Sequence, residues 1–178
     1  IGHGAGVEHA IMLDQTFEAV RPLARNPVHH VTAIGCAQRT GVFRVDLLVD
    51  PTGGGKAQLR FVSVHTTAPI PGYWSRWKRS LDELASMRSH EGSRYVFMGD
   101  FNATMDHASM REFLGTRFHD AAYGSGHGFA FTAPANLFAV PTLTAVDHVV
   151  VDSDMTAGQV QVKRVSGSDH AALLATID

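Results

Sequence analysis

Polar side chains suited to acid–base and metal chemistry stand where apolar, strand-like runs of this chain end. His65 closes one such run, and Asp100 and Asn102 follow another in the tetrapeptide Gly-Asp-Phe-Asn. Asp169 and His170 follow a third, in the tetrapeptide Gly-Ser-Asp-His. Because ligands of α/β folds collect at the ends of strands, these five residues are candidates for one site.

A sixth candidate, Asp147, lies inside an apolar run rather than after one. It is followed by His148 and by three valines. Burying a polar group without a partner costs of order 2–7 kcal/mol. We therefore expect Asp147 to have a partner, and a histidine is the natural one.

This set of residues matches the needs of phosphoester hydrolysis. That reaction uses a hard cation on the phosphate oxygens, which carboxylates bind. It also uses a histidine held by a carboxylate as general base, and neutral or cationic donors that contact the phosphate. The residues that supply this inventory are His65, Asp100, Asn102, Asp147, Asp169 and His170.

Each block taken alone has a structural explanation. Asp, Asn and Ser are common in turns that follow strands, which would explain Asp100 with Asn102 and Ser168 with Asp169. A lone His65 is more often a hydrogen-bonded structural histidine than a functional one. The order and context of the blocks together favour the functional interpretation.

The elements that must position these residues are mostly strands. The pattern predicts strands over Val42 to Val49, Leu59 to Val64, Arg94 to Met98, Leu143 to Val151, Val160 to Val165 and Ala172 to Ile177. It predicts helices over Tyr73 to Arg88, with Trp74 and Trp77 in the core, and over Ser109 to Leu114. Loops are expected over His3 to Glu8 and Tyr123 to Gly128, which gives an α+β or α/β class of packed sheets. The glycines before Lys56 are interpreted as a hairpin turn rather than a phosphate-binding loop, because Asp50 and Ala57 break that motif.

Composition places the chain among compact globular proteins without naming a partner. Its 178 residues are typical of a single domain, and 44% hydrophobic content is that of a globular protein. The net charge of −2 does not favour a nucleic acid, although one is not excluded. The single Cys36 excludes an internal disulfide. No apolar run reaches about 20 residues, but the absence of an initial Met suggests a piece of a longer protein.

Four ordered blocks resemble the endonuclease/exonuclease/phosphatase superfamily, which includes deoxyribonuclease I. They are Ser63-Val64-His65, Gly99-Asp100-Phe101-Asn102, Val146-Asp147-His148-Val149-Val150 and Gly167-Ser168-Asp169-His170. The string that continues from Asn102 to His107 resembles an actinobacterial branch, whose members often carry a membrane-spanning N-terminal region. The resemblance runs from about Val42 to the C-terminus.

The resemblance implies a fold and a role for each residue. The fold would be α+β, a four-layer sandwich of two mixed β-sheets flanked by helices. Asp169 would be a ligand of Mg²⁺, with Mn²⁺ as a substitute, and His170 the general base oriented by Asp147. Asp100 would position or deprotonate the attacking water. Asn102 and His65 would contact the scissile phosphate.

The chain departs from the family pattern at its N-terminal side. Family members begin with a strand that carries an Asn and continue with a strand that ends in Gln-Glu, whose Glu is the principal metal ligand. Neither block is found, and Glu8 stands in a context interpreted as loop. Residues 1–178 are therefore expected to form the C-terminal part of one such domain, which a missing segment or a partner chain would complete.

Two classes of function remain open. The first is a metal-dependent phosphoesterase acting on a phosphate mono- or diester of unidentified type. The second is a binding or assembly module that has the same fold but impaired catalysis, because it lacks the metal-ligand Glu. An extracytoplasmic, membrane-tethered location follows only from the resemblance.

Overall fold

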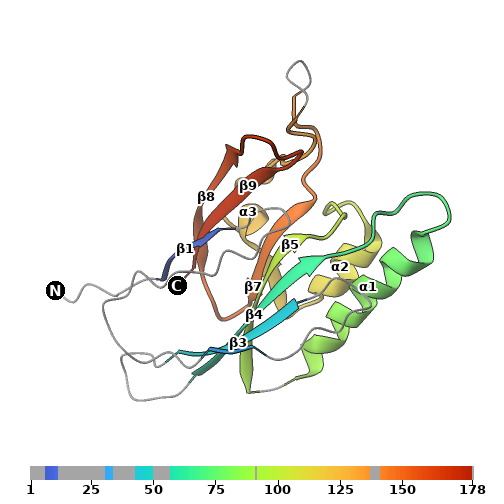
Figure 1. Cartoon of the computed structure of the whole chain (residues 1–178). Helices are drawn as coiled ribbons and strands as arrows, with labels where there is room; N and C mark the ends of the chain where they lie inside the picture. Colours follow the sequence, from blue (N-terminus) through green and yellow to red (C-terminus); the bar gives the residue numbers. More distant parts are fainter. Residues whose placement is uncertain are drawn as a thin grey trace.

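The structure is a computed structural model that describes residues 7–11, 31–33, 43–49, 57–90, 92–136 and 141–177, with side chains from residue 59 onward. Its strands form two sheets packed face to face, and two helices, α1 and α2, cover the other face of the larger sheet (Figure 1). The expected α+β sandwich is confirmed. The glycine-rich turn before Lys56 and Cys36 lie outside the described residues.

The larger sheet is mixed and holds the first three site-bearing strands. Its order is β2-β3-β4-β5-β7-β6, with β4 and β5 parallel and the other neighbours antiparallel. The strands are β2 (Val31–Ala33), β3 (Phe43–Val49), β4 (Ala57–His65), β5 (Ser93–Asp100), β6 (Phe118–Asp120) and β7 (Asp147–Asp152).

The smaller sheet has the order β1-β9-β8, and its described pairings are antiparallel. Its strands are β1 (Val7–Ile11), β8 (Ala157–Arg164) and β9 (Ala171–Ile177). Glu8 thus lies in a strand, so the expected loop over His3 to Glu8 is wrong at its end. The glycines around it hid a strand that forms through pairing with β9, more than 160 residues away, which no local pattern reports.

Strand β5 is apolar from Tyr95 to Met98 because both of its faces are covered there. Tyr95 and Phe97 face helices α1 and α2, whereas Val96 and Met98 face the smaller sheet. A strand buried on two sides has no polar alternation, so its sequence is a continuous apolar run. The first polar side chain of the run is Asp100, where the strand leaves the core.

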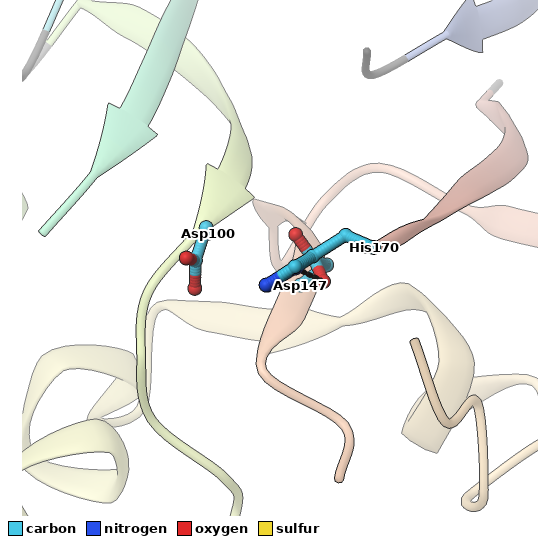
Figure 2. Close-up of side chains that lie close together, drawn as sticks. All are labelled: Asp100, Asp147 and His170. Atoms are coloured by element: carbon cyan, nitrogen blue, oxygen red, sulfur yellow. Dashed lines mark hydrogen bonds and ion pairs between the residues drawn. The ribbon is translucent and has the colours of Figure 1, made fainter. Parts of the chain in front are cut away.

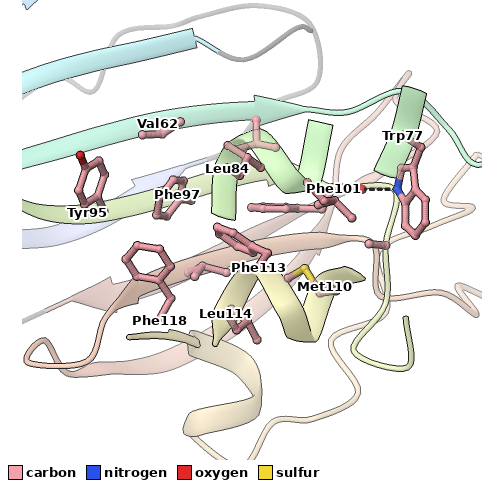
Figure 3. Packing of buried hydrophobic residues seen from close by; sticks show 14 residues of the cluster. Val62, Trp77, Leu84, Tyr95, Phe97, Phe101, Met110, Phe113, Leu114 and Phe118 are labelled. Carbon is pink, nitrogen blue, oxygen red and sulfur yellow. Dashed lines mark hydrogen bonds between the residues drawn. The ribbon is translucent and has the colours of Figure 1, made fainter. Parts of the chain in front are cut away.

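Helix α1 (Trp74–Ser86) packs one amphipathic face on the sheet, and Met87–Ser89 continues it as a short 3-10 turn, η1. Its buried residues include Trp77, Leu81 and Leu84, at the spacing of one helical face (Figure 3). The Trp77 indole also donates to the Phe101 carbonyl at 3.2 Å, which ties α1 to the segment after β5. Trp74 was expected in the core but is 54% exposed, because it lies at the edge of that face against Trp77.

The second helix is as expected and the connections after it are not. Helix α2 (Ala108–Leu114) ends at Gly115, whose φ of 53° favours glycine. A short helix, α3 (Ala121–Gly124), occupies the start of the predicted loop, since the Asp120 carboxylate caps it by accepting from the Tyr123 N–H at 2.8 Å. Strand β7 begins at Asp147 rather than at Leu143, whose side chain is 60% exposed.

Arg117 ties together the sheet end remote from the candidate site. Its guanidinium donates to both carboxylate oxygens of Asp152 at 2.8–3.2 Å. It also donates to the carbonyls of Arg88, His90 and Ser93 at 2.7–2.8 Å. The planar fork of arginine suits this many fixed acceptors, so one side chain holds β5, η1 and β7 together.

Within the ranges that the structure describes, no helix combines the length and the apolar character required to cross a membrane.

Candidate active site

The register of the larger sheet places three candidate residues in one row. His65 ends β4 opposite Asp100 at the end of β5, and Asp100 is opposite Asp147 at the start of β7. The parallel pair brings two strand ends to one edge, and the antiparallel β7 begins at that same edge. The sheet itself therefore assembles the first half of the site.

Gly99 allows this close approach of β4 and β5. Its φ is +152°, and a Cβ at this position would lie 1.8 Å from the Val64 carbonyl oxygen. Backbone atoms cannot move away from such a contact without breaking the parallel pairing. The glycine before Asp100 is therefore a packing requirement of the site.

Asp147 and His170 form the predicted pair. The Asp147 carboxylate is 1% exposed and its Oδ2 lies 2.7 Å from His170 Nδ1. His170 precedes β9, so this bond joins the two sheets at the site edge. The hydrogen bond and charge of Asp147 raise the pKa of His170 from 6.5 to about 9, with smaller contributions from Asp100 and Asp169. Figure 2 shows the Asp100, Asp147 and His170 side chains directed toward one another.

Asp100 completes a compact group of ligand atoms. One such atom each from Asp100, Asp147 and His170 lie within 4.8 Å of one another. Burial, together with the charge of Asp147, raises the pKa of Asp100 from 3.8 to about 6. The protein thus holds two acidic groups close together at a cost that a bound cation would offset.

Asn102 braces Asp100 in this structure. Its φ of 46° turns the chain back, so that its backbone N–H donates to Asp100 Oδ1 at 2.7 Å. Its side-chain Nδ2 donates to Asp100 Oδ2 at 3.0 Å and to the Thr66 carbonyl at 2.9 Å. Both amide hydrogens are engaged within the protein, so contact of Asn102 with a phosphate stays a prediction.

His65 and Asp169 lie at the margin of this group. The His65 ring is 59% exposed, and its Nε2 is 3.8 Å from Asp100 Oδ2. The exposed Asp169 adjoins His170, and its backbone carbonyl accepts from the Ala135 N–H at 2.6 Å. The role of Asp169 as a metal ligand and that of His65 as a phosphate contact stay predictions.

The donor set fits a divalent cation. Hard cations such as Mg²⁺ prefer carboxylate oxygens, and Mn²⁺ accepts carboxylate and imidazole together. Two carboxylates and one imidazole converge from three different strands or strand ends, and burial together with the charge of Asp147 raises the pKa of Asp100. The residues present therefore fit the divalent cation that the family resemblance implied.

The sequence model of the Endonuclease/Exonuclease/phosphatase family matches residues 14–170, and this range contains every candidate site residue. The chain belongs to this family. Comparison with curated proteins found no match.

Solved structures share the fold at low identity. A functionally unknown conserved protein from Enterococcus faecalis has 17% identity and a TM-score of 0.60, over 76% of this chain and 55% of its own. A humanised D. rerio TDP2 has 16% identity and a TM-score of 0.58, over 85% of this chain and 66% of its own. A Bacteroides thetaiotaomicron mannosyl-6-phosphatase has 13% identity and a TM-score of 0.52, over 77% of this chain and 57% of its own. This family member thus spans between 55% and 66% of the length of these structures.

The sequence did not predict one interaction that supports the site in this family member. The buried His148 ring places Nδ1 2.8 Å from Asp120 Oδ2 and Nε2 2.7 Å from the Ala103 carbonyl. Burial opposes its charge, but the hydrogen bond and charge of Asp120 outweigh this, so the pKa of His148 is raised. The His-Asp pair anchors the segment that follows Asn102 to β7. Asp120 carried no motif, because its partner is 28 residues away.

Proposed function

We propose that this chain is the C-terminal part of a single catalytic domain, a divalent-cation-dependent phosphoesterase that hydrolyses a phosphate mono- or diester by attack of an activated water. The observation that carries the proposal is the convergence of Asp100, Asp147 and His170 at one edge of the two sheets. Membership of the Endonuclease/Exonuclease/phosphatase family supports the reaction class.

The protein residues handle the protons. With His170 Nδ1 bonded to Asp147, Nε2 is the nitrogen that exchanges a proton with water or with the leaving oxygen. Asp147 fixes the ring orientation and the tautomer. Asp100 orients or deprotonates the attacking water, and its position is fixed by the two bonds from Asn102. His65 and Asn102 are proposed to contact the phosphate.

Asp100 and Asp147 would hold the cation, with the exposed Asp169 as a further proposed ligand. Bound Mg²⁺, or Mn²⁺ in its place, would neutralise phosphate oxygens and polarise the phosphorus centre. Without it, a His170 pKa of about 9 keeps the imidazole protonated at neutral pH. A cation held by these carboxylates would oppose that protonation and so favour the neutral imidazole that a general base requires.

The proposed substrate class is a phosphate ester of modest size. Nucleic acid is the less favoured partner because the net charge is −2, and tight binding of a polyanion needs many Lys and Arg contacts. One structural neighbour is named a mannosyl-6-phosphatase, which is compatible with a small ester.

Two observations favour the alternative, a binding module with impaired catalysis. The pKa of His170, raised to about 9, favours the protonated imidazole at neutral pH, and both amide hydrogens of Asn102 are bonded within the protein. A module of this kind would keep the fold without turnover.

Hydrolysis of bis-p-nitrophenyl phosphate with and without Mg²⁺ separates the two functions. We expect Mg²⁺-dependent turnover, and a 10²- to 10⁴-fold lower kcat in His170→Ala, the range lost with a general acid or base. Asp169→Ala should raise the Mg²⁺ concentration needed. The control is His90→Ala, an exposed histidine after η1. Equal rates in the wild type, His170→Ala and Asp169→Ala would refute the phosphoesterase.

A further inference from the structure

A groove leads away from the candidate site between helices α2 and α3. A hollow of about 310 Å³ is lined by Met105, Arg111, His119 and Tyr123 among others. A smaller space of about 20 Å³ adjoins it, shares Met105 and Tyr123, and reaches Asp147. Asp147 lines only the smaller space, and Asp100 and His170 line neither hollow. The larger hollow is at the lower end of the size range of ligand pockets, about 300–1,000 Å³.

The walls of the groove suit a compact organic group. Tyr123 is 66% exposed and presents its ring to solvent, although large aromatic side chains gain free energy when buried. Met105 is half-buried beside it, and a thioether adapts to varied apolar surfaces. A sugar or heterocyclic ring laid on these two side chains would bury both.

The charge of the groove selects for an anion. The Asp120 carboxylate in its wall is hydrogen-bonded to His148, whose Nδ1 lies 2.8 Å from Asp120 Oδ2. Arg111 is exposed, and its bonds among the described residues go to the neutral carbonyls of Met105 and Asp106 at 2.9 and 2.6 Å. No carboxylate in the described part of the chain is paired with Arg111. The larger hollow, which Asp147 does not line, is thus bordered by an arginine that has no ion-pair partner among the described residues.

We propose that this groove is a substrate subsite that binds the alcohol portion of a phosphoester carrying a second anionic group. The scissile phosphate would lie at Asp100, Asp147 and His170, the ring on Tyr123 and Met105, and the second group, a phosphate or a carboxylate, at Arg111. The guanidinium fork matches either oxyanion. This inference rests on the proposed phosphoesterase function.

A matched ligand series tests the subsite. Glucose 1-phosphate, glucuronic acid 1-phosphate and glucose 1,6-bisphosphate share one scissile group and differ only at the sixth carbon. Isothermal titration calorimetry with Mg²⁺ on the His170→Ala protein, in which hydrolysis is slowed, should show tighter binding of the two ligands with a second anion. Arg111→Gln should weaken these two about tenfold, the value of one charge-assisted hydrogen bond, and leave glucose 1-phosphate within twofold. Arg111→Lys should retain most of the preference.

The controls keep the subsite separate from catalysis. Arg79→Gln removes an exposed arginine on α1 and should change none of the three affinities. Tyr123→Ala should weaken all three ligands alike, because it removes the surface for the ring. Absence of binding of the two ligands with a second anionic group, or an Arg111→Gln effect equal on all three, would overturn the subsite. His170-dependent hydrolysis unaffected by Arg111→Gln would overturn the subsite alone, whereas Arg111-dependent binding without hydrolysis would overturn the phosphoesterase alone.

Discussion

Asp100→Asn should stabilise the cation-free protein, because the charge of Asp100 is unfavourable in the fold. Burial and the neighbouring Asp147 raise the Asp100 pKa from 3.8 to about 6, which corresponds to about 3 kcal/mol at neutral pH. The replacement amide can still accept from the Asn102 N–H, but its own NH₂ faces Asn102 Nδ2 at the 3.0 Å contact, which costs about 1 kcal/mol. A net gain of about 2 kcal/mol follows.

The pH dependence gives the sign of the effect. Because the pKa of the Asp100 carboxyl is raised on folding, the protein loses stability as the pH increases from the unfolded-state pKa of 3.8 through the folded-state pKa of about 6. The gain of Asp100→Asn should therefore be full above about pH 7, whereas near pH 4 only the cost of the amide contact remains and the variant should be about 1 kcal/mol less stable than the wild type. Urea unfolding with EDTA at these two pH values measures it.

Two further arms make the test decisive. At 100 times its dissociation constant, Mg²⁺ should stabilise the wild type by about 2.7 kcal/mol and leave the stability of Asp100→Asn unchanged. The stability difference between the two proteins should therefore narrow or change sign. The control is Asp82→Asn, which breaks an exposed ion pair with Lys78 on α1 and should leave the stability nearly unchanged at either pH. An Asp100→Asn protein less stable than the wild type in EDTA at pH 7.5 would refute the reasoning.

Three other substitutions test the rest of the structure. Asp147→Asn should lower the His170 pKa from about 9 toward 6.5, measured by NMR titration, and remove the stability that His170 lends below about pH 6.5 and that is lost as pH rises through about 9. Arg117→Met should cost about 3–5 kcal/mol in urea unfolding, because it leaves the buried Asp152 charge unpaired. Gly99→Ala should cost more than about 3 kcal/mol, since its Cβ would overlap a backbone carbonyl of β4.

Controls of the same chemistry accompany these changes. Arg94→Met breaks an exposed pair with Asp154 and should cost at most about 1 kcal/mol. Gly126→Ala has a φ of +80° but open space around its Cβ, so it should cost about 1 kcal/mol. An unchanged His170 pKa in Asp147→Asn, or costs for Arg117→Met and Gly99→Ala no larger than those of their controls, would contradict the contacts described above.

Much of the site could be predicted because its residues stand at the ends of strands that the sequence pattern itself predicts. The apolar run before Asp100 is continuous, since β5 is covered on both faces. The need of a buried Asp147 for a partner follows from desolvation alone, and His170 is that partner at 2.7 Å.

The rest depended on contacts that a local pattern does not encode. Glu8 lies in a strand because of pairing with the far end of the chain. Helical spacing placed Trp74 and Trp77 on one face but could not tell that the first lies at its exposed edge. Leu143 reads as part of a strand, yet its backbone N–H bonds to the Ala133 carbonyl in a separate connection. Asp120 had no signal, because its role arises only where His148 meets it.

Binding of Mn²⁺, followed by electron paramagnetic resonance at pH 7.5, tests the central claim without knowledge of the substrate. The account predicts one bound ion per chain in the wild type and in Asp82→Asn, and loss of that ion in Asp100→Asn and Asp147→Asn. Magnesium should compete for the same site. An ion bound equally by all four proteins, or bound by none, would contradict the assignment of Asp100, Asp147 and His170 as a cation-dependent hydrolytic centre.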